Sequence, residues 1–242
     1  DMVSQIDTPE GLAALEDMIR SGRHLHPEVA TTKFFDNWER FAKGRAYCNI
    51  GWGGAQKLYN AKGSKLRGRL LYGPTPGGEI GPDGSVVSIP YFNWGWSYVV
   101  NRASKRPRIG YLFSLFASSP EMSTRAIREV GGFFDPNRPE HYEDPVIQEV
   151  YSKPFLEVHK ASLKQAIPDL YLMGQAEYFR VLNEALADAI NGHVTPQRAL
   201  KRASQLWEMI TSRAGRAGQI ERWRQLRAQY PAQVAMILRD VK

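Results

Sequence analysis

Tyr91 to Lys105, YFNWGWSYVVNRASK, is the stretch on which the expected fold depends. In its first half Phe92, Trp94 and Trp96 alternate with small or polar residues, so an extended backbone would place the aromatic rings on one face. Residues 98–101, which follow, are typical of a short buried strand. The stretch therefore predicts an aromatic binding surface that continues into a strand.

A helix is predicted directly after this strand. Ser104 can cap its N-terminus, and Ile109, Leu112, Phe113 and Phe116 recur at helical spacing. Such an apolar stripe needs a partner surface. If the protein began at Asp1, much apolar surface between residues 98 and 116 would be exposed.

A second aromatic position lies upstream, in RAYCNIGWGG at residues 45–54. The segment predicts a strand that ends at Trp52 and Gly53, where glycine lets a ligand approach the backbone and the indole lies beside it. The alternative is an ordinary strand-to-helix turn with a core tryptophan. Cys48, in the same predicted strand, is expected to be a buried and inert thiol. It is the only cysteine, which excludes an internal disulfide and a cysteine-cluster metal site.

A third segment, residues 167–190, predicts a loop followed by a helix. The expected core stripe of this helix consists of apolar residues at helical spacing: Phe179, Leu182, Leu186 and Ile190. Tyr178 lies off that stripe and is therefore the better candidate for a ligand contact. Gln175 and Glu177 are its polar neighbours and could bind hydroxyl groups.

The order of these motifs resembles the extracellular solute-binding proteins that serve ABC importers, especially the carbohydrate-binding, maltose-binding-protein-like family (type II). The similar motifs are F-x-x-G-(K/R)-A-x-x-x-I-G-W, a P-x-P-G-G turn, the aromatic crossover with its (A)SK-x-P helix start, the SPE helix start that Ser119 would cap, and G-x-x-(T/S)-P-x-x-A-L. In this chain they lie at residues 41–52, 74–78, 91–107, 119–121 and 192–200.

The resemblance runs from about Thr8 to about Ile210 and covers only the later part of the family pattern. It implies an α/β fold with two lobes, represented by most of the C-terminal lobe plus a strand-helix segment of the N-terminal lobe. Residues 1–95 and 144–242 would belong to the C-terminal lobe, the latter with a helical tail, and residues 96–143 to the N-terminal lobe. The chain is therefore expected to be a fragment, a nicked product or part of a longer sequence, with the missing N-terminal part as a partner.

The resemblance also implies a function, the substrate-binding component of an ABC import system. Such a protein captures a sugar or polyol between its lobes by hinge closure and delivers it to the membrane permease, without chemistry on the ligand. Aromatic rings would pack against the C–H faces of the sugar, and polar groups would bind its hydroxyls. The implied ligand-binding residues are Trp52, Gly53, Asn93, Trp94, Gly95, Trp96, Gln175, Glu177 and Tyr178. No cofactor, metal or catalytic residue is expected, and the expected location is the periplasm or the cell surface.

Other functions stay open at this point. The net charge of +7 would suit a phosphorylated polyol or another acidic solute on the same fold. The arginines between Arg202 and Arg227 could bind nucleic acid, but Glu208 and Glu221 lie among them, which is typical of a solvated helix face. A glycoside-acting enzyme needs two carboxylates around the bond it cleaves, and none lies beside the aromatic stretch in the sequence.

No apolar run approaches the roughly 20 residues that span a bilayer, and DMVSQIDTPEG lacks the features of a signal peptide.

Overall fold

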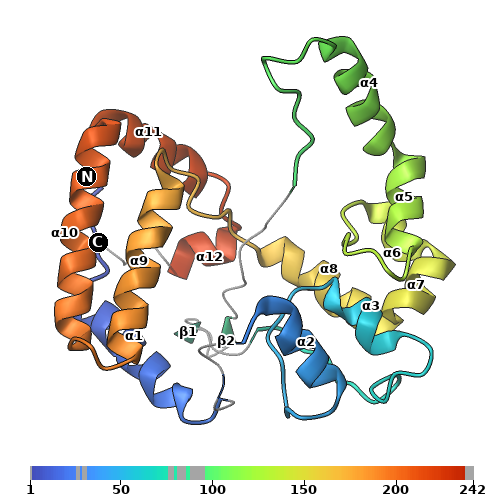
Figure 1. Ribbon diagram of the computed structural model, residues 1–242, viewed down its shortest axis with the longest axis horizontal. Helices are drawn as coiled ribbons and strands as arrows, with labels where there is room; N and C mark the ends of the chain where they lie inside the picture. The colour runs from blue at the N-terminus through green and yellow to red at the C-terminus, as the bar shows by residue number, and fades with distance from the viewer. Residues whose placement is uncertain are drawn as a thin grey trace. The chain divides into compact units, whose positions relative to one another are not determined.

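The computed structural model describes residues 2–25, 28, 32–75, 79–80, 86–87 and 96–237. The chain divides into two compact units, which are described separately. Unit 1 comprises Asp1–Thr31 and Pro168–Tyr230, and unit 2 comprises Thr32–Ile167 and Pro231–Lys242. Figure 1 follows the elements in chain order, from blue to red.

Unit 1 is helical in its described residues. Its helices are α1 (Pro9–Gly22), α9 (Gln175–Ile190), α10 (Pro196–Ala214) and α11 (Arg216–Arg227). A short turn joins α9 to α10, and the two helices lie side by side, while α1 and α11 also contact α10 (Figure 1). The starts of α1 and α10 are set locally, because the side chains of Thr8 and Thr195 each accept a backbone N–H of the first turn and a proline follows each of them.

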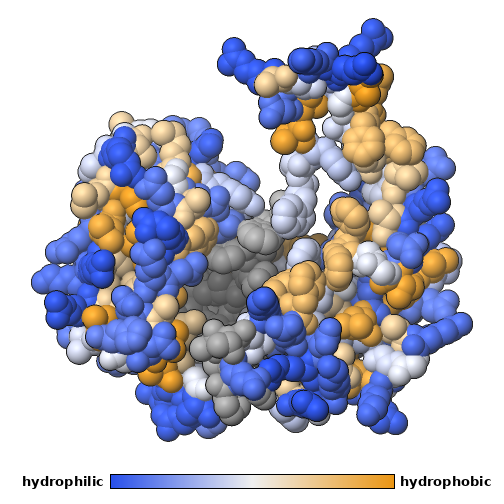
Figure 2. All heavy atoms as spheres, in the orientation of Figure 1, coloured by the Kyte–Doolittle hydropathy of each residue, from blue (hydrophilic) through white to orange (hydrophobic). Residues whose placement is uncertain are grey.

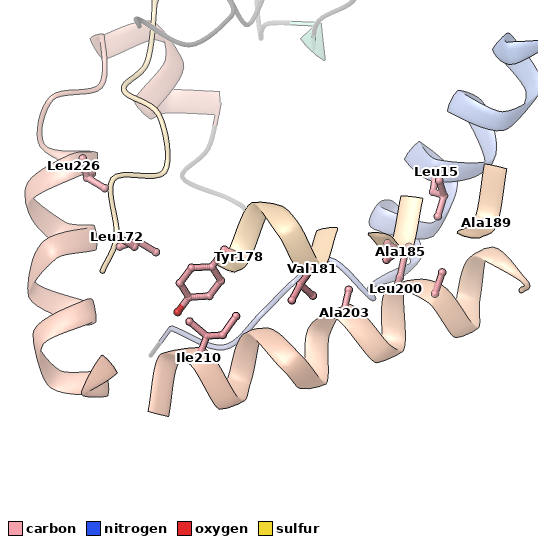
Figure 3. Packing of buried hydrophobic residues seen from close by; sticks show 11 residues of the cluster. Leu15, Leu172, Tyr178, Val181, Ala185, Ala189, Leu200, Ala203, Ile210 and Leu226 are labelled. Atoms are coloured by element: carbon pink, nitrogen blue, oxygen red, sulfur yellow. The ribbon is translucent and has the colours of Figure 1, made fainter. Parts of the chain in front are cut away.

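The core of unit 1 lies on a different face of α9 from the predicted stripe. Tyr178, Val181, Ala185 and Ala189 are buried, whereas Ile190, expected in the core, is 46% exposed. Figure 3 shows Tyr178 and Val181 directed toward α10. Of the predicted stripe, only Leu186 packs against this core, and it is partly buried; the buried positions instead include the alanines Ala185 and Ala189 of α9 and Ala199 and Ala203 of α10. Sequence periodicity alone gave more weight to the larger residues on the adjacent face.

Unit 2 contains more and shorter helices. They are α2 (Phe34–Ala42), α3 (Ala55–Asn60), α4 (Pro107–Ala117), α5 (Pro120–Arg128), α6 (Pro139–Glu143), α7 (Pro145–Tyr151), α8 (Lys153–Gln165) and α12 (Ala232–Ile237). Two strands, β1 (Glu79–Ile80) and β2 (Val86–Val87), pair antiparallel, with Glu79 opposite Val87. Nowhere in the described ranges is a helix both long and apolar enough to cross a membrane.

Two apolar clusters hold unit 2 together. The first joins α5 to α8 through Ile127, Tyr142, Ile147, Tyr151 and Leu156, and the second joins α2 to α3 through Trp38, Phe41, Ala55 and Tyr59. Beside the first cluster, the ring of His159 stacks on Tyr142 and on Phe155, and its Nδ1 lies 2.9 Å from the Tyr142 hydroxyl. Burial lowers the pKa of His159 to about 4.

The expected α/β architecture is wrong for the part of the chain that the structure describes. These residues are mostly helical, and their only strands are the two-residue pair β1 and β2. The segments expected to be strands, around Tyr47, Leu71 and Val99, belong to no helix or sheet, and these three side chains are almost fully exposed. A strand is stabilised by hydrogen bonds to a neighbouring strand, and the described residues supply none for them. Cys48, expected to be buried, is exposed for the same reason.

The helix predicted after residue 104 is confirmed as α4, although its N-cap is Arg106. The Ser104 hydroxyl instead accepts the backbone N–H of Arg106, at 3.2 Å. No residue of α4 is buried, and its apolar stripe is more than half exposed at Ile109, Leu112, Phe113 and Phe116. Figure 2 shows apolar side chains along this helix. The predicted exposure of apolar surface between residues 98 and 116 is therefore confirmed.

Candidate functional site

Trp52 belongs to an aromatic cluster formed by α2, by the segment before α3 and by the segment after α5. Its ring centroid lies 5.9 Å from that of Phe34 and 6.2 Å from that of Trp38. Phe133 packs 5.8 Å from Trp38 and 5.5 Å from Phe35. Trp38 is buried beneath the cluster, while Phe34, Phe35 and Phe133 are each about half exposed. We call Phe34, Phe35, Trp52 and Phe133 the aromatic surface, since they offer ring faces and edges to a ligand.

A partly buried carboxylate binds the indole of Trp52. The indole Nε1–H of Trp52 donates to Oδ2 of Asp135. The other carboxylate oxygen, Oδ1, lies 3.2 Å from the hydroxyl oxygen of Tyr151, whose single hydrogen is shared between this carboxylate and the closer carbonyl of Phe134, at 2.5 Å. Tyr151 is fully buried and its ring stacks on Phe155. Both oxygens of Asp135 therefore have a partner, and one of them is the indole.

The charge opposite this carboxylate comes from Lys57, a lysine that is only 1% exposed. Its ammonium donates to the carbonyl of Glu129 at 2.9 Å and lies 5.3 Å from the centre of the Tyr151 ring. Burial raises the pKa of Asp135 to about 6, although the hydrogen bonds from Trp52 and Tyr151 and the charge of Lys57 act against the rise. Burial likewise lowers the pKa of Lys57 to about 8. At neutral pH both groups are thus mainly ionised, close to the midpoints of their titrations.

The glycines after Trp52 make room for this arrangement. A Cβ atom on Gly53 would lie 3.0 Å from Oδ1 of Asp135 and 3.3 Å from the ring of Phe155. A Cβ atom on Gly54 would lie 3.0 Å from the carbonyl oxygen of Phe133. The predicted close approach at Gly53 is therefore occupied in this structure by the chain's own carboxylate.

The polar candidates of the third segment lie in unit 1, in the first turn of α9, and each has a partner. Gln175 donates to the carboxylate of Asp169 at 3.0 Å, and the exposed Glu177 pairs with Arg213. Tyr178 is 2% exposed, with its hydroxyl 2.7 Å from that of Thr211 and 3.2 Å from the amide nitrogen of Gln219. Only Gln175 and Glu177 therefore keep part of their side chains accessible.

The remaining predicted contacts lie on or beside the opening stretch of sequence. Trp96 belongs to no helix or strand and is 76% exposed. Asn93, Trp94 and Gly95 lie outside the described residues. The structure thus brings Trp52 and Gly53 together in unit 2 and Gln175, Glu177 and Tyr178 together in unit 1.

Sequence reasoning missed the three residues that support Trp52, namely Asp135, Lys57 and Tyr151. Nothing in the sequence around Lys57 indicates burial, because lysine is rarely buried without a partner charge. That partner, Asp135, is far away in the sequence. The only local sign was the pair Gly53-Gly54. Two glycines indicate that another group lies close to the backbone, but they do not identify that group. Within the described ranges, no group of three or more histidine, cysteine, aspartate or glutamate residues could hold a metal ion.

Comparison with known proteins relates this fold to that of a maltose-bound protein. The solved structure is that of MalE3 from T. maritima with maltose bound, which is similar to this chain with a TM-score of 0.68 and 21% sequence identity. The similarity covers 87% of this chain and 54% of that one, so this chain spans about half the length of MalE3. At this identity the likeness shows the fold alone. No family model matches the sequence.

Proposed function

We propose that this chain is part of a sugar-binding receptor whose ligand contacts the aromatic surface at Trp52. The observation that carries the proposal is the likeness of its fold, over most of its length, to that of a protein solved with maltose bound. The aromatic surface supports it chemically, because sugar rings present C–H faces that pack on aromatic side chains. Trp96, with Asn93, Trp94 and Gly95, is proposed to add to this contact.

The groups at the start of α9 are proposed to bind ligand hydroxyls. A ligand hydroxyl would replace Asp169 as the partner of Gln175 or Arg213 as the partner of Glu177. Tyr178 is buried, so we assign it the role of fixing this turn, through its bond to Thr211. The receptor would then deliver a sugar or polyol, chemically unchanged, to the transmembrane subunits of an ABC importer at the periplasm or the cell surface.

A binding experiment on this chain tests the proposal. We expect maltose, or another sugar or polyol in a panel that also contains glycerol 3-phosphate, to bind in isothermal titration calorimetry. Trp52→Ala should weaken that binding about tenfold or more, because it removes a stacked ring, whereas Trp52→Phe should weaken it less. Trp223→Phe, a change in α11, serves as the control and should leave affinity unchanged.

The result can contradict the proposal in three ways. Binding of glycerol 3-phosphate alone would indicate an acidic solute, and chemical change of the sugar on incubation would indicate an enzyme. If no compound of the panel binds while circular dichroism shows the folded chain, the sugar-binding proposal is wrong.

The exposed face of α4 is proposed to contact further polypeptide. The similarity covers only 54% of the maltose-bound chain, and α4 leaves Ile109, Leu112, Phe113 and Phe116 more than half exposed. We propose that the occupant of this face is the polypeptide that corresponds to the part of MalE3 that this chain does not span. That polypeptide is the expected N-terminal part of the same protein.

Without its occupant, this face should make the chain associate with itself. Changing Leu112 and Phe116 together to lysine should raise the dissociation constant of self-association about tenfold or more, since each buried apolar side chain contributes about 1.5–3 kcal/mol. Sedimentation velocity measures this. A control with Gln197→Lys and Gln225→Lys adds the same charge at exposed polar positions. Equal association of wild type, variant and control would show that α4 is not the contact face.

A further inference from the structure

We infer that Asp135 is the positioning residue of the binding site, because its carboxylate fixes the indole of Trp52 in the orientation in which it meets the ligand. The inference deepens the proposed function and rests on it for the ligand. Its structural part, the link between Asp135 and Trp52, can be tested without any sugar.

The first step is the geometry of the hydrogen bonds that fix the indole of Trp52. An indole has a single N–H, and in Trp52 that group donates to Oδ2 of Asp135. Oδ1 is held near the hydroxyl of Tyr151, a fully buried residue whose ring stacks on Phe155. With both oxygens engaged, the carboxylate cannot rotate freely, so the orientation of the indole edge is set from within the core of unit 2.

The second step is that the loop after Trp52 fits around the carboxylate. The position of a Cβ on Gly53 lies 3.0 Å from Oδ1, and that on Gly54 lies 3.0 Å from the carbonyl oxygen of Phe133, two residues before Asp135. A side chain at Gly53 would crowd the carboxylate of Asp135, and one at Gly54 would crowd the carbonyl of Phe133. The same two glycines that were expected to admit a ligand therefore bring Trp52 to its anchor.

The third step is the charge state of the anchor. The ionisable groups that act on it are Lys57 of α3, Tyr151 of α7 and Tyr142 of α6, and the backbone carbonyl of Glu129 holds Lys57. Burial raises the pKa of Asp135 to about 6, so the carboxylate becomes protonated as the pH falls from 7.5 to 5. Protonation removes the negative charge that strengthens the bond from the indole, while the added proton can be donated from Oδ1 to the hydroxyl oxygen of Tyr151. The hydrogen bond from the indole of Trp52 to Asp135 is therefore weakened below about pH 6.

The first measurement uses the ligand-free chain. Tryptophan fluorescence is followed from pH 7.5 to 4.5 for wild type, Trp52→Phe, Asp135→Asn and the control Asp144→Asn. Wild type and control should show a transition near pH 6 that both other variants lack. Asp144 is a suitable control because Arg128 and the N-terminus of α7 hold its pKa below the usual value, so it does not titrate in this range. A transition that persists in Asp135→Asn would overturn the inference.

The second measurement is the affinity for the sugar that binds in the calorimetric panel. Wild type should bind about fivefold more weakly at pH 5 than at pH 7.5, the difference expected between a charge-assisted and a neutral hydrogen bond, whereas Asp135→Asn should bind equally at both. Equal pH dependence in both proteins would overturn the inference and leave sugar binding intact. Loss of the fluorescence transition in Asp135→Asn without binding of any sugar would leave the link between Asp135 and Trp52 intact and overturn the proposed function.

Discussion

Replacing Lys57 by methionine is expected to lower the free energy of unfolding of unit 2 by about 2 kcal/mol at pH 7.5, because the carbonyl of Glu129 loses its charged donor and the ionised Asp135 loses a nearby positive charge. The ammonium of Lys57 is the cation that acts on the ionised Asp135, and it also satisfies the carbonyl of Glu129. Methionine fills a similar volume, so little of the loss comes from a cavity.

The pH dependence of this loss identifies its cause. The pKa of Asp135 is raised on folding from 3.8 to about 6, so the folded state binds more protons between these values and its stability falls as the pH rises through them. Below about pH 6 the carboxyl is mainly neutral and no longer needs the ammonium. The loss in Lys57→Met should therefore shrink at pH 5 to about 1 kcal/mol, the value of the hydrogen bond to Glu129.

Urea unfolding at pH 7.5 and pH 5 measures both losses. Differences between variant and wild type are compared, because His159, whose pKa is lowered to about 4, contributes a slope of opposite sign to both proteins. Lys160→Met is a matched control, since Lys160 also lies over a tyrosine ring, at 5.4 Å, but is 47% exposed. Lys160→Met should lower the free energy of unfolding by less than about 0.5 kcal/mol. A loss in Lys57→Met that does not change with pH would show that Asp135 is not its partner.

In unit 1 the largest effect is expected from Gln219→Ala, a loss of about 3 kcal/mol. Gln219 is fully buried in α11, where its amide oxygen accepts the N–H of Met173 at 3.0 Å and its amide nitrogen donates to the carbonyl of Met173 at 2.8 Å. The same nitrogen also lies 3.2 Å from the hydroxyl of Tyr178. Alanine would leave these groups without their partner and open a small cavity beside them.

Thermal and urea unfolding of this variant should be compared with Gln225→Ala. Gln225 lies in the same helix, but it is exposed and pairs only within α11, with Glu221. Its replacement removes the same side chain without burying an unpaired group, so the expected change is within about 0.5 kcal/mol. Similar losses in the two variants would show that the bonds of Gln219 do not stabilise unit 1.

The sequence predicted what is decided locally. The helix start at Ser119 is confirmed, and α10 begins in the same way at Thr195, because a capping hydroxyl and the proline after it act within one turn. The strand expected at residues 98–101 was wrong, since a strand depends on neighbours that a local pattern cannot supply. At Trp52 the aromatic residue and its glycines could be picked out, but its anchor, Asp135, comes from the segment between α5 and α6 and only the folded chain brings the two together.

The stacked ring of His159 provides a reference for the titration of its neighbours. Because its pKa is lowered to about 4, the imidazole stays neutral from pH 8 down to about pH 5, the interval in which Asp135 gains its proton. Its ring lies against Phe155, which also stacks on Tyr151, the residue whose hydroxyl reaches Asp135. In nuclear magnetic resonance spectra, a shift of the His159 ring protons in this interval would report movement of the neighbouring rings and not protonation of the histidine itself.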